Sequence, residues 1–349
     1  MRNRGNGKGG GVAAAGLVPE DMGVSREVLE TDYLLAVAYL DPEVRPGVEA
    51  EDIAPTFEVD HVRRVPQAGP DAVPGLAVPP PEVWQYFVRV RPDVLAAFAA
   101  DTGLAADGGR CSDEVVFQNS YRLNSRHYAT GGDKRAFVLS HGRNLMVWKM
   151  VGYADDVLRH YRLEDFRARV WIGHHRYPTK GTVWHPGGAH PFVGLHEALV
   201  HNGDFANYAS MCSYLAQRNI HPLYVTDTEV AVQLFDLLHR VYGYPLEYVI
   251  EAMAPTTERD FAQLPADRRA IYRRLQTAHV NGSPDGPWFF LLAQSLAARA
   301  KGRQGRQRLI GITDTSMLRP QVFALQRADG VAVGLAASEK QAIDATLES

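Results

Sequence analysis

The sequence predicts a layered α+β fold, in which strands in series are interrupted by a group of helices. Three observations support this prediction. Short apolar runs bounded by turn residues recur along the chain, helical patterns cluster between residues 205 and 279, and no internal repeat or alternating βαβ pattern is visible. The 349 residues are 46% hydrophobic and 22% charged, which is typical of a folded globular protein.

Composition excludes several classes of protein. Lys and Arg number 37 against 40 for Asp and Glu, so no basic surface for nucleic acid is expected. No apolar run approaches the ~20 residues of a membrane helix. The two cysteines, Cys111 and Cys212, cannot build a disulfide framework, and residues 1–17 do not match a signal peptide. We therefore expect a cytoplasmic protein with neither nucleic acid nor a membrane as its partner.

The first third of the chain begins with a glycine-rich segment. Residues 4–11 (RGNGKGGG) predict a loop, and the small residues 12–17 predict a strand after it. A loop of this kind with nothing ahead of it has little to pack against, so the chain reads as if it starts inside a fold. Residues 25–110 are predicted to form a small α+β insertion. They contain two strand-like runs, a proline-rich stretch and glycine-rich breaks.

The remainder is more regular. Gly142-Arg143-Asn144 between two apolar runs predicts a β-hairpin, and Asn202-Gly203 predicts a turn after a strand. Thr226 and Glu229 form a capping-box pattern at the start of a helix. Further helices are expected at 155–161, 205–218, within 246–279 and after Ser338, and further strands at 33–39, 56–62, 168–174, 197–201, 288–292, 309–313, 321–325 and 331–336.

Residues 173–204 form the segment with the most polar chemistry. It is long and irregular, which is typical of functional loops, and six of the chain's 13 histidines lie in it. A metal site is one interpretation, but no HExxH motif is present and acidic residues are few, so structural roles are favoured and no metal is predicted. The histidines concerned are His174, His175, His185, His190, His196 and His201.

A small-molecule pocket is the second interpretation of the same segment. The Arg176 guanidinium and the Thr179 hydroxyl suit a carboxylate. Asn202 and the backbone N–H of Gly203 suit an oxyanion. Asp227 suits an ammonium group, although a helix-capping role is equally open. A third interpretation, a phosphate-binding loop in residues 5–11, fails because Lys8 is followed by Gly9 and no strand precedes it.

Four ordered motifs resemble the class II glutamine amidotransferase domain. They are Arg176-Tyr-Pro-Thr179, Ala189-His-Pro-Phe192, His201-Asn-Gly203 and Thr226-Asp-Thr-Glu229. Arg4-Gly5 and the late series Asp314, Arg319-Pro320 and Ala337-Ser338-Glu339 add to the likeness. The RGNGKGGG segment resembles the stand-alone amidotransferase subunit of archaeal-type glutamate synthases. The resemblance covers residues 1–20 and about 130–349, which makes residues 1–349 one domain with 25–110 as its insertion.

This resemblance implies a four-layer αββα N-terminal-nucleophile fold and the hydrolysis of L-glutamine to glutamate and ammonia. Arg176 and Thr179 would hold the α-carboxylate of glutamine, Asp227 its α-ammonium group, and Asn202 and Gly203 the tetrahedral oxyanion. The domain would need no cofactor. Its ammonia would pass to glutamate synthase subunits on separate chains, which carry FMN and iron–sulfur centres in that family.

One departure from the family pattern concerns the nucleophile. The family uses a cysteine at the first position of the mature chain, whose free amine is the general base. Residue 1 here is Met, and neither Cys111 nor Cys212 has a free amine beside its thiol; both are expected to be small packing residues. The first hypothesis is a glutaminase whose Met1 is an internal residue, inactive as written. The alternatives are a non-catalytic glutamine-binding or scaffolding subunit, and a metal-dependent hydrolase that uses the histidine-rich segment.

Overall fold

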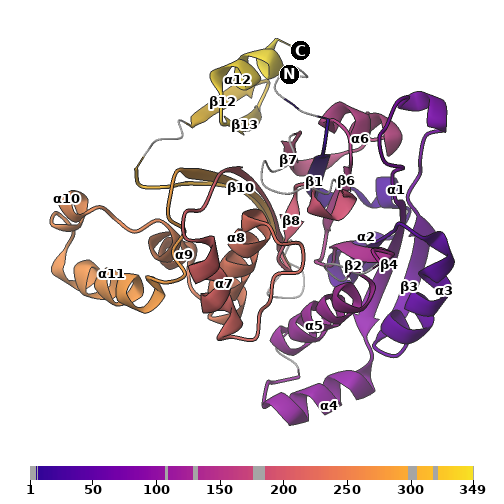
Figure 1. The fold of residues 1–349 in the computed structure, drawn as a ribbon, viewed down its shortest axis with the longest axis horizontal. Coiled ribbons are helices and arrows are strands. Elements are labelled where there is room, and N and C mark those ends of the chain that lie inside the picture. Colours follow the sequence, from indigo (N-terminus) through magenta and orange to yellow (C-terminus); the bar gives the residue numbers. More distant parts are fainter. Residues whose placement is uncertain are drawn as a thin grey trace.

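The computed structural model describes most of the chain and combines helices with antiparallel sheets, as the sequence predicts (Figure 1). The described residues are 5, 7–106, 109–128, 133–175, 185–297, 305–316 and 321–348. Arg4, Arg176, Thr179, Arg319 and Pro320 lie outside these residues. All ladders between the described strands are antiparallel, so the prediction of an α+β fold without parallel βαβ units is confirmed.

Strand β1 (Gly10–Leu17) is the centre of a three-stranded sheet that we call the β1 sheet. It pairs with β6 (Leu145–Met150) on one side and with β7 (Ala168–His174) on the other. All eight residues of β1 are buried, and its three consecutive alanines are completely inaccessible. Small side chains at these positions let neighbouring layers approach closely on both faces of the strand.

A second sheet, the β10 sheet, packs against the β1 sheet. Its strand order is β11 (Arg306–Thr313), β10 (Trp288–Leu296), β9 (Glu197–Gly203) and β8 (Phe192–Val193). Strands β1 and β7 contact β10, and β7 also contacts β11. Successive side chains of a strand point to opposite faces, so every second residue of β9 and β10 faces the β1 sheet.

The two faces of the β10 sheet carry different parts of the core. Ala198, Val200 and Ala293 join the core shared with the β1 sheet, whereas the alternating Leu199 and Leu292 pack on the opposite side. Helices cover this second face. They are α7 (Tyr208–Ala216), α8 (Asp227–Asp236) and α9 (Leu246–Met253), and beyond α9 lie α10 (Glu258–Phe261) and α11 (Ala266–His279). The helical stretch predicted within residues 246–279 is thereby confirmed.

The third sheet holds all three strands described within residues 25–110, and we call it the β2 sheet. Its order is β3 (Phe57–Arg64), β4 (Glu82–Val90), β2 (Tyr33–Tyr39) and β5 (Ala136–Ser140). Strand β5 comes from outside the predicted insertion, so that segment shares a sheet with the rest of the chain. The associated helices are α1 (Pro19–Met22), α2 (Arg26–Thr31), α3 (Arg45–Val48), α4 (Pro92–Thr102) and α5 (Arg110–His127).

The predicted hairpin at Gly142-Arg143-Asn144 is wrong, because β5 and β6 belong to different sheets. The turn instead carries the chain from the β2 sheet to the β1 sheet. A Cβ on Gly142 would lie 2.1 Å from the Leu195 carbonyl oxygen, and Asn144 has a φ of 53°. Close backbone approach and a left-handed conformation therefore account for both residues without strand pairing.

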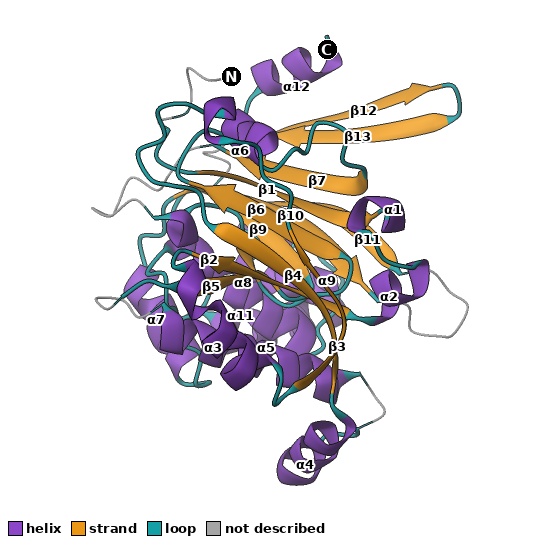
Figure 2. Cartoon of the chain, turned by 90° about the vertical axis from the view of Figure 1, so that its right-hand side faces the viewer, coloured by secondary structure: helices purple, strands orange, loops and turns teal. Residues whose placement is uncertain are grey.

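The C-terminal part adds a hairpin, β12 (Val322–Ala328) with β13 (Val331–Ala337), and helix α12 (Lys340–Leu347). Figure 2 shows these elements at one end of the molecule, near α6 (Ala154–His160). Within the described ranges, every helix is too short or too polar to cross a membrane.

Candidate functional site

Asn202 and Gly203, the two predicted oxyanion residues, lie at the end of β9. They stand opposite Phe289 and Trp288 of β10, so the strand continues through both residues and the predicted turn is wrong. Gly203 has a φ of +145°, and a Cβ there would lie 2.2 Å from the Pro287 carbonyl oxygen. Only glycine fits this backbone conformation and this close contact.

Asp227 is the first residue of α8, and its carboxylate does not cap the helix. Thr226 is the N-cap, because its hydroxyl accepts the Glu229 N–H at 3.1 Å. This geometry decides against the capping role for Asp227. The Asp227 Oδ1 atom lies 3.5 Å from His201 Nδ1 and 3.4 Å from Thr228 Oγ1, and 18% of the side chain is exposed. The carboxylate is thus anchored on one side and accessible on the other.

The environment of Asp227 keeps this carboxylate ionised. Burial by itself raises the pKa of Asp227, but the ring of His201 and hydrogen bonds from Thr228 outweigh that effect and lower the pKa below 3.8. An ionised and partly exposed carboxylate at the first residue of α8 is able to bind a cationic group of a ligand.

A chain of buried polar groups runs behind Asp227. The His201 backbone N–H donates to His190 Nδ1 at 3.4 Å, which assigns the proton of a neutral His190 ring to Nε2. That Nε2 lies 3.0 Å from Thr228 Oγ1, and donates to it. Burial, and after it the neighbouring cationic groups, lower the pKa of His190 well below its usual value. His190 therefore stays neutral and orients the Thr228 hydroxyl.

The start of β1 meets this polar chain. Gly11 is opposite His174, whose ring stacks on that of His190 with a centroid distance of 4.2 Å. A Cβ on Gly11 would lie 2.2 Å from the His190 carbonyl oxygen and 2.8 Å from Lys149 Cβ. The last glycine of the RGNGKGGG segment is thus required by the close approach of β1 to the site.

The six histidines of residues 173–204 do not form one cluster. His190 and His201 contact Thr228 and His174 stacks on His190, whereas the others have separate surroundings. His185 Nδ1 is 2.8 Å from the hydroxyl of Tyr128, and His196 Nε2 is 3.1 Å from Asp113 Oδ2. Among the described side chains, no three His, Cys, Asp or Glu residues gather in a way that could hold a metal ion.

Of the predicted site residues, the structure places Asn202, Gly203 and Asp227 at neighbouring ends of β9 and α8. Arg176 and Thr179 lie outside the described residues.

The roles of His190 and Thr228 were not predicted from the sequence. His190 precedes a proline in a histidine-rich segment, and Thr228 lies inside the helix-capping pattern, so neither residue stands out from its neighbours. One signal for a buried polar site was nevertheless present, because a histidine, His201, directly follows the apolar run of β9.

The two cysteines are not activated thiols. Cys111 is buried on α5, where its Sγ lies 3.8 Å from the Leu95 carbonyl oxygen, and Cys212 lies half-buried on α7. Burial raises the pKa of both thiols, which disfavours the nucleophilic thiolate.

A second group of buried titratable side chains lies close to the site. Lys149 on β6 donates to the carbonyl oxygens of Gly187 and Pro191, at 3.0 and 3.2 Å. Glu229, one position beyond Thr228, accepts two backbone N–H groups of the preceding loop at 2.6 and 2.8 Å. Both side chains line one cavity. Burial lowers the pKa of Lys149 to about 7 and raises the pKa of Glu229 to about 7.

This burial predicts a pH dependence of stability. The folded pKa of Glu229 lies above its unfolded value of 4.5, so its favourable contribution is complete below pH 4.5 and is lost as the pH rises to about 7. Relative to Glu229→Gln, the wild type should therefore lose unfolding free energy between pH 5 and 7, as measured by urea titration. Glu258→Gln on exposed α10 is the control and should keep the pH profile of the wild type. If the unfolding free energy of Glu229→Gln changed with pH in parallel with that of the wild type, the prediction would be contradicted.

Comparison with known proteins adds evidence on relatedness. No protein-family model matches the chain. An uncharacterised protein of Archaeoglobus fulgidus is 29% identical over 322 residues, which cover 92% of this chain and 74% of that protein. The glutamine--fructose-6-phosphate aminotransferase of Campylobacter jejuni is 30% identical over 139 residues, and that of Aeropyrum pernix 33% identical over 145 residues.

These two alignments cover 39% and 41% of this chain but only 22% and 23% of the aminotransferases. The chain therefore matches less than a quarter of the length of these enzymes. Over about two fifths of its residues it is similar to glutamine-utilising aminotransferases.

Proposed function

We propose that this chain is a class II glutamine amidotransferase domain. Its fold is then a four-layer αββα sandwich of the N-terminal-nucleophile type, with residues 25–110 as an insertion in one domain of residues 1–349. The proposal is supported by the packing of the β1 sheet on the β10 sheet, by the helices on the outer face of the latter, and by the partial similarity to glutamine-utilising enzymes.

The Asp227 carboxylate is the observation that carries this proposal. It is ionised, accessible and not used as a helix cap, which suits the α-ammonium group of L-glutamine. Arg176 and Thr179 bind the α-carboxylate. Asn202 and the Gly203 N–H, at the end of β9, donate to the oxyanion that forms when the side-chain amide is attacked.

The reaction that we propose is hydrolysis of glutamine to glutamate and ammonia, with the ammonia passed to a glutamate-synthase-like partner on separate chains. Attack on the amide requires an activated nucleophile. A polypeptide of these 349 residues has Met at position 1, and the pKa of each cysteine thiol is raised. We infer that such a polypeptide binds glutamine without hydrolysing it. A non-catalytic glutamine-binding or scaffolding subunit is the second candidate, and the raised pKa of both thiols favours it.

Calorimetry with L-glutamine, paired with an ammonia-release assay, tests this function. The 349-residue polypeptide is expected to bind L-glutamine and to release no ammonia above the buffer rate. Absence of binding by the folded protein would contradict the proposal. Ammonia release that persists in a Cys111→Ser, Cys212→Ser double variant would contradict the inferred lack of a nucleophile.

A further inference from the structure

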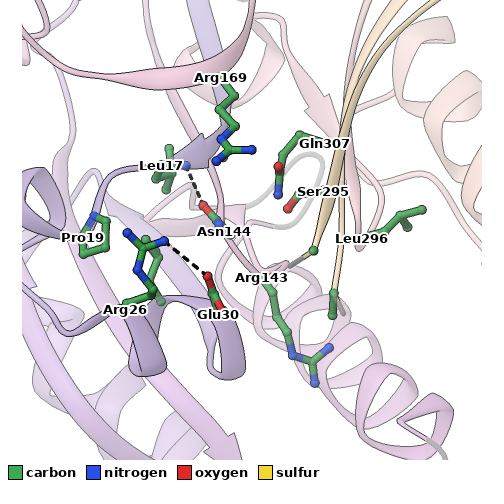
Figure 3. Close-up of a pocket in the computed structure, with 14 residues that line it drawn as sticks. Leu17, Pro19, Arg26, Glu30, Arg143, Asn144, Arg169, Ser295, Leu296 and Gln307 are labelled. Carbon is green, nitrogen blue, oxygen red and sulfur yellow. Dashed lines mark hydrogen bonds and ion pairs between the residues drawn. The ribbon is translucent and has the colours of Figure 1, made fainter. Parts of the chain in front are cut away.

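A separate cavity lies at the opposite end of the two packed sheets from Asn202 and Asp227. It is bordered by the end of β1, by α2, by the turn between β5 and β6, and by the ends of β10 and β11 that face away from the candidate site (Figure 3). Gly11 and Gly16 are five residues apart on β1, and Phe289 and Ser295 are six apart on β10. At about 3.3 Å per residue, the two sites are therefore roughly 16–20 Å apart.

Positive charge prevails in the lining of this cavity. Three arginines, Arg26, Arg143 and Arg169, line it against one acidic residue, Glu30. The contact between Arg26 and Glu30 is long, 3.8 Å, and both side chains are exposed, so it neutralises Arg26 weakly. Arg169 has no ion pair with any residue in the part of the chain that the structure describes, and it remains available at the rim.

The guanidinium of Arg143 is held by residues that do not line the cavity. Its guanidinium bonds Asp113 at 3.0 Å and the Thr31 carbonyl oxygen at 2.9 Å, and it stacks 3.7 Å above the ring of Tyr33. These contacts balance much of its charge but fix its orientation. Figure 3 shows the Arg143 guanidinium pointing away from Asn144 and Ser295, so its side chain borders the cavity while its charged end is bound outside it.

Neutral hydrogen-bonding groups complete the lining. Asn144 Oδ1 accepts the Leu17 N–H at 2.6 Å, which fixes the amide and leaves its NH2 group to donate. Ser295 is only 2% exposed, and no described residue binds its hydroxyl. Gln307 adds a second amide. Figure 3 shows Arg169, Asn144, Ser295 and Gln307 around the same space.

A glycine at the end of β1 keeps the layers this close together. Gly16 has a φ of +73°, and a Cβ there would lie 2.9 Å from Arg169 Cβ and 3.0 Å from Gln307 Cγ. The backbone of β1 therefore passes directly beside two of the lining side chains, where any larger residue would be strained and would displace them.

We propose that this cavity binds a small polyanion, a metabolite with phosphate or carboxylate groups, at a site distinct from the proposed glutamine site. Arg26 and Arg169 attract the anion, and the donors of Asn144, Ser295 and Gln307 bind its oxygen atoms. Because the lining comes from both the β1 sheet and the β10 sheet, the bound anion links the two layers. This inference does not depend on the proposed function.

Calorimetric titration with pyrophosphate and with citrate, in phosphate-free buffer of low ionic strength, tests the proposal. Binding of at least one probe is expected, and Arg169→Gln should weaken it about tenfold. Ser295→Ala, which removes a neutral donor, should weaken it less. Arg327→Gln removes the same charge from exposed β12 and is the matched control, with unchanged affinity expected.

The pattern across probes identifies the source of the anion. Tighter binding of pyrophosphate supports a phosphate-bearing ligand, and tighter binding of citrate supports a polycarboxylate. Equal losses in Arg169→Gln and Arg327→Gln would overturn the proposal, because binding would then follow net charge alone. Failure of both probes to bind, or their displacement by L-glutamine, would overturn it as well. Melting temperatures of the variants verify that each is folded.

Discussion

Asp227→Asn should weaken the binding of L-glutamine about thirtyfold or more. The substitution keeps the size of the side chain but removes the negative charge that we assign to the α-ammonium group. Losing one partner of a largely desolvated charge pair costs about 2–5 kcal/mol, because the ammonium group stays buried without its counter-ion. Isothermal titration calorimetry of the wild type and the variant with L-glutamine measures the effect directly.

This prediction has two controls, a glutamine analogue and a second variant. A glutamine analogue that lacks the α-amino group should bind the wild type and Asp227→Asn with similar affinity, since neither complex contains the charge pair. Asp260→Asn on exposed α10 should bind L-glutamine like the wild type. If Asp227→Asn bound L-glutamine normally, or lost the analogue to the same degree, Asp227 would not be the ammonium ligand.

Gly11→Ala is expected to destabilise the fold by about 3 kcal/mol. The added Cβ would lie 2.2 Å from the carbonyl oxygen of His190, a backbone atom that cannot rotate away. Strand β1 is central in its sheet, so the strain has to be relieved by moving β1 or the segment that contains His190. Urea unfolding followed by circular dichroism measures the loss of stability.

Gly47→Ala is the matched control for this substitution. Gly47 lies exposed on α3, and a Cβ there meets nothing within 4 Å. The change should stabilise the protein slightly, by about 0.5–1 kcal/mol, since alanine restricts the unfolded chain. Equal effects of the two substitutions would show that Gly11 is not needed for close approach. A stable Gly11→Ala variant would lead to the same conclusion.

Local sequence patterns predicted most helices and strands, because apolar periodicity and capping residues lie within the element that they specify. The all-apolar run of β2 and the capping residue Thr226 matched the structure. Burial of a strand and capping of a helix both select the type of neighbouring residues in the sequence. The helices α4 and α5 and the strand β4 were not predicted. Helix α5 has a weakly segregated apolar face with polar Asn119 and Ser120 buried, so its periodicity is obscured. Which sheet β5 joins depends on long-range pairing, which no local pattern encodes.

The candidate site was predictable in its residue types but not in its connections. The chemistry of Asn202, Gly203 and Asp227 follows from their donors and charges, and the structure places them at adjoining element ends. The link from His190 through Thr228 to Asp227 joins residues up to 38 positions apart, so it depends on how the segment before β8 packs against α8. The low exposure of Lys149 likewise follows from layer packing, although a lone lysine within an apolar strand was a visible clue.

The pairing of β2 with β5 also sets a limit on how this protein can be divided. Residues 25–110 read in sequence as a self-contained unit, yet their sheet is finished by a strand from the following segment. Removing that unit would leave β5 without its neighbour and would uncover the core packed beneath α5. Residues 25–110 and β5 therefore form one sheet, so this segment cannot be excised or exchanged without the strand that follows it.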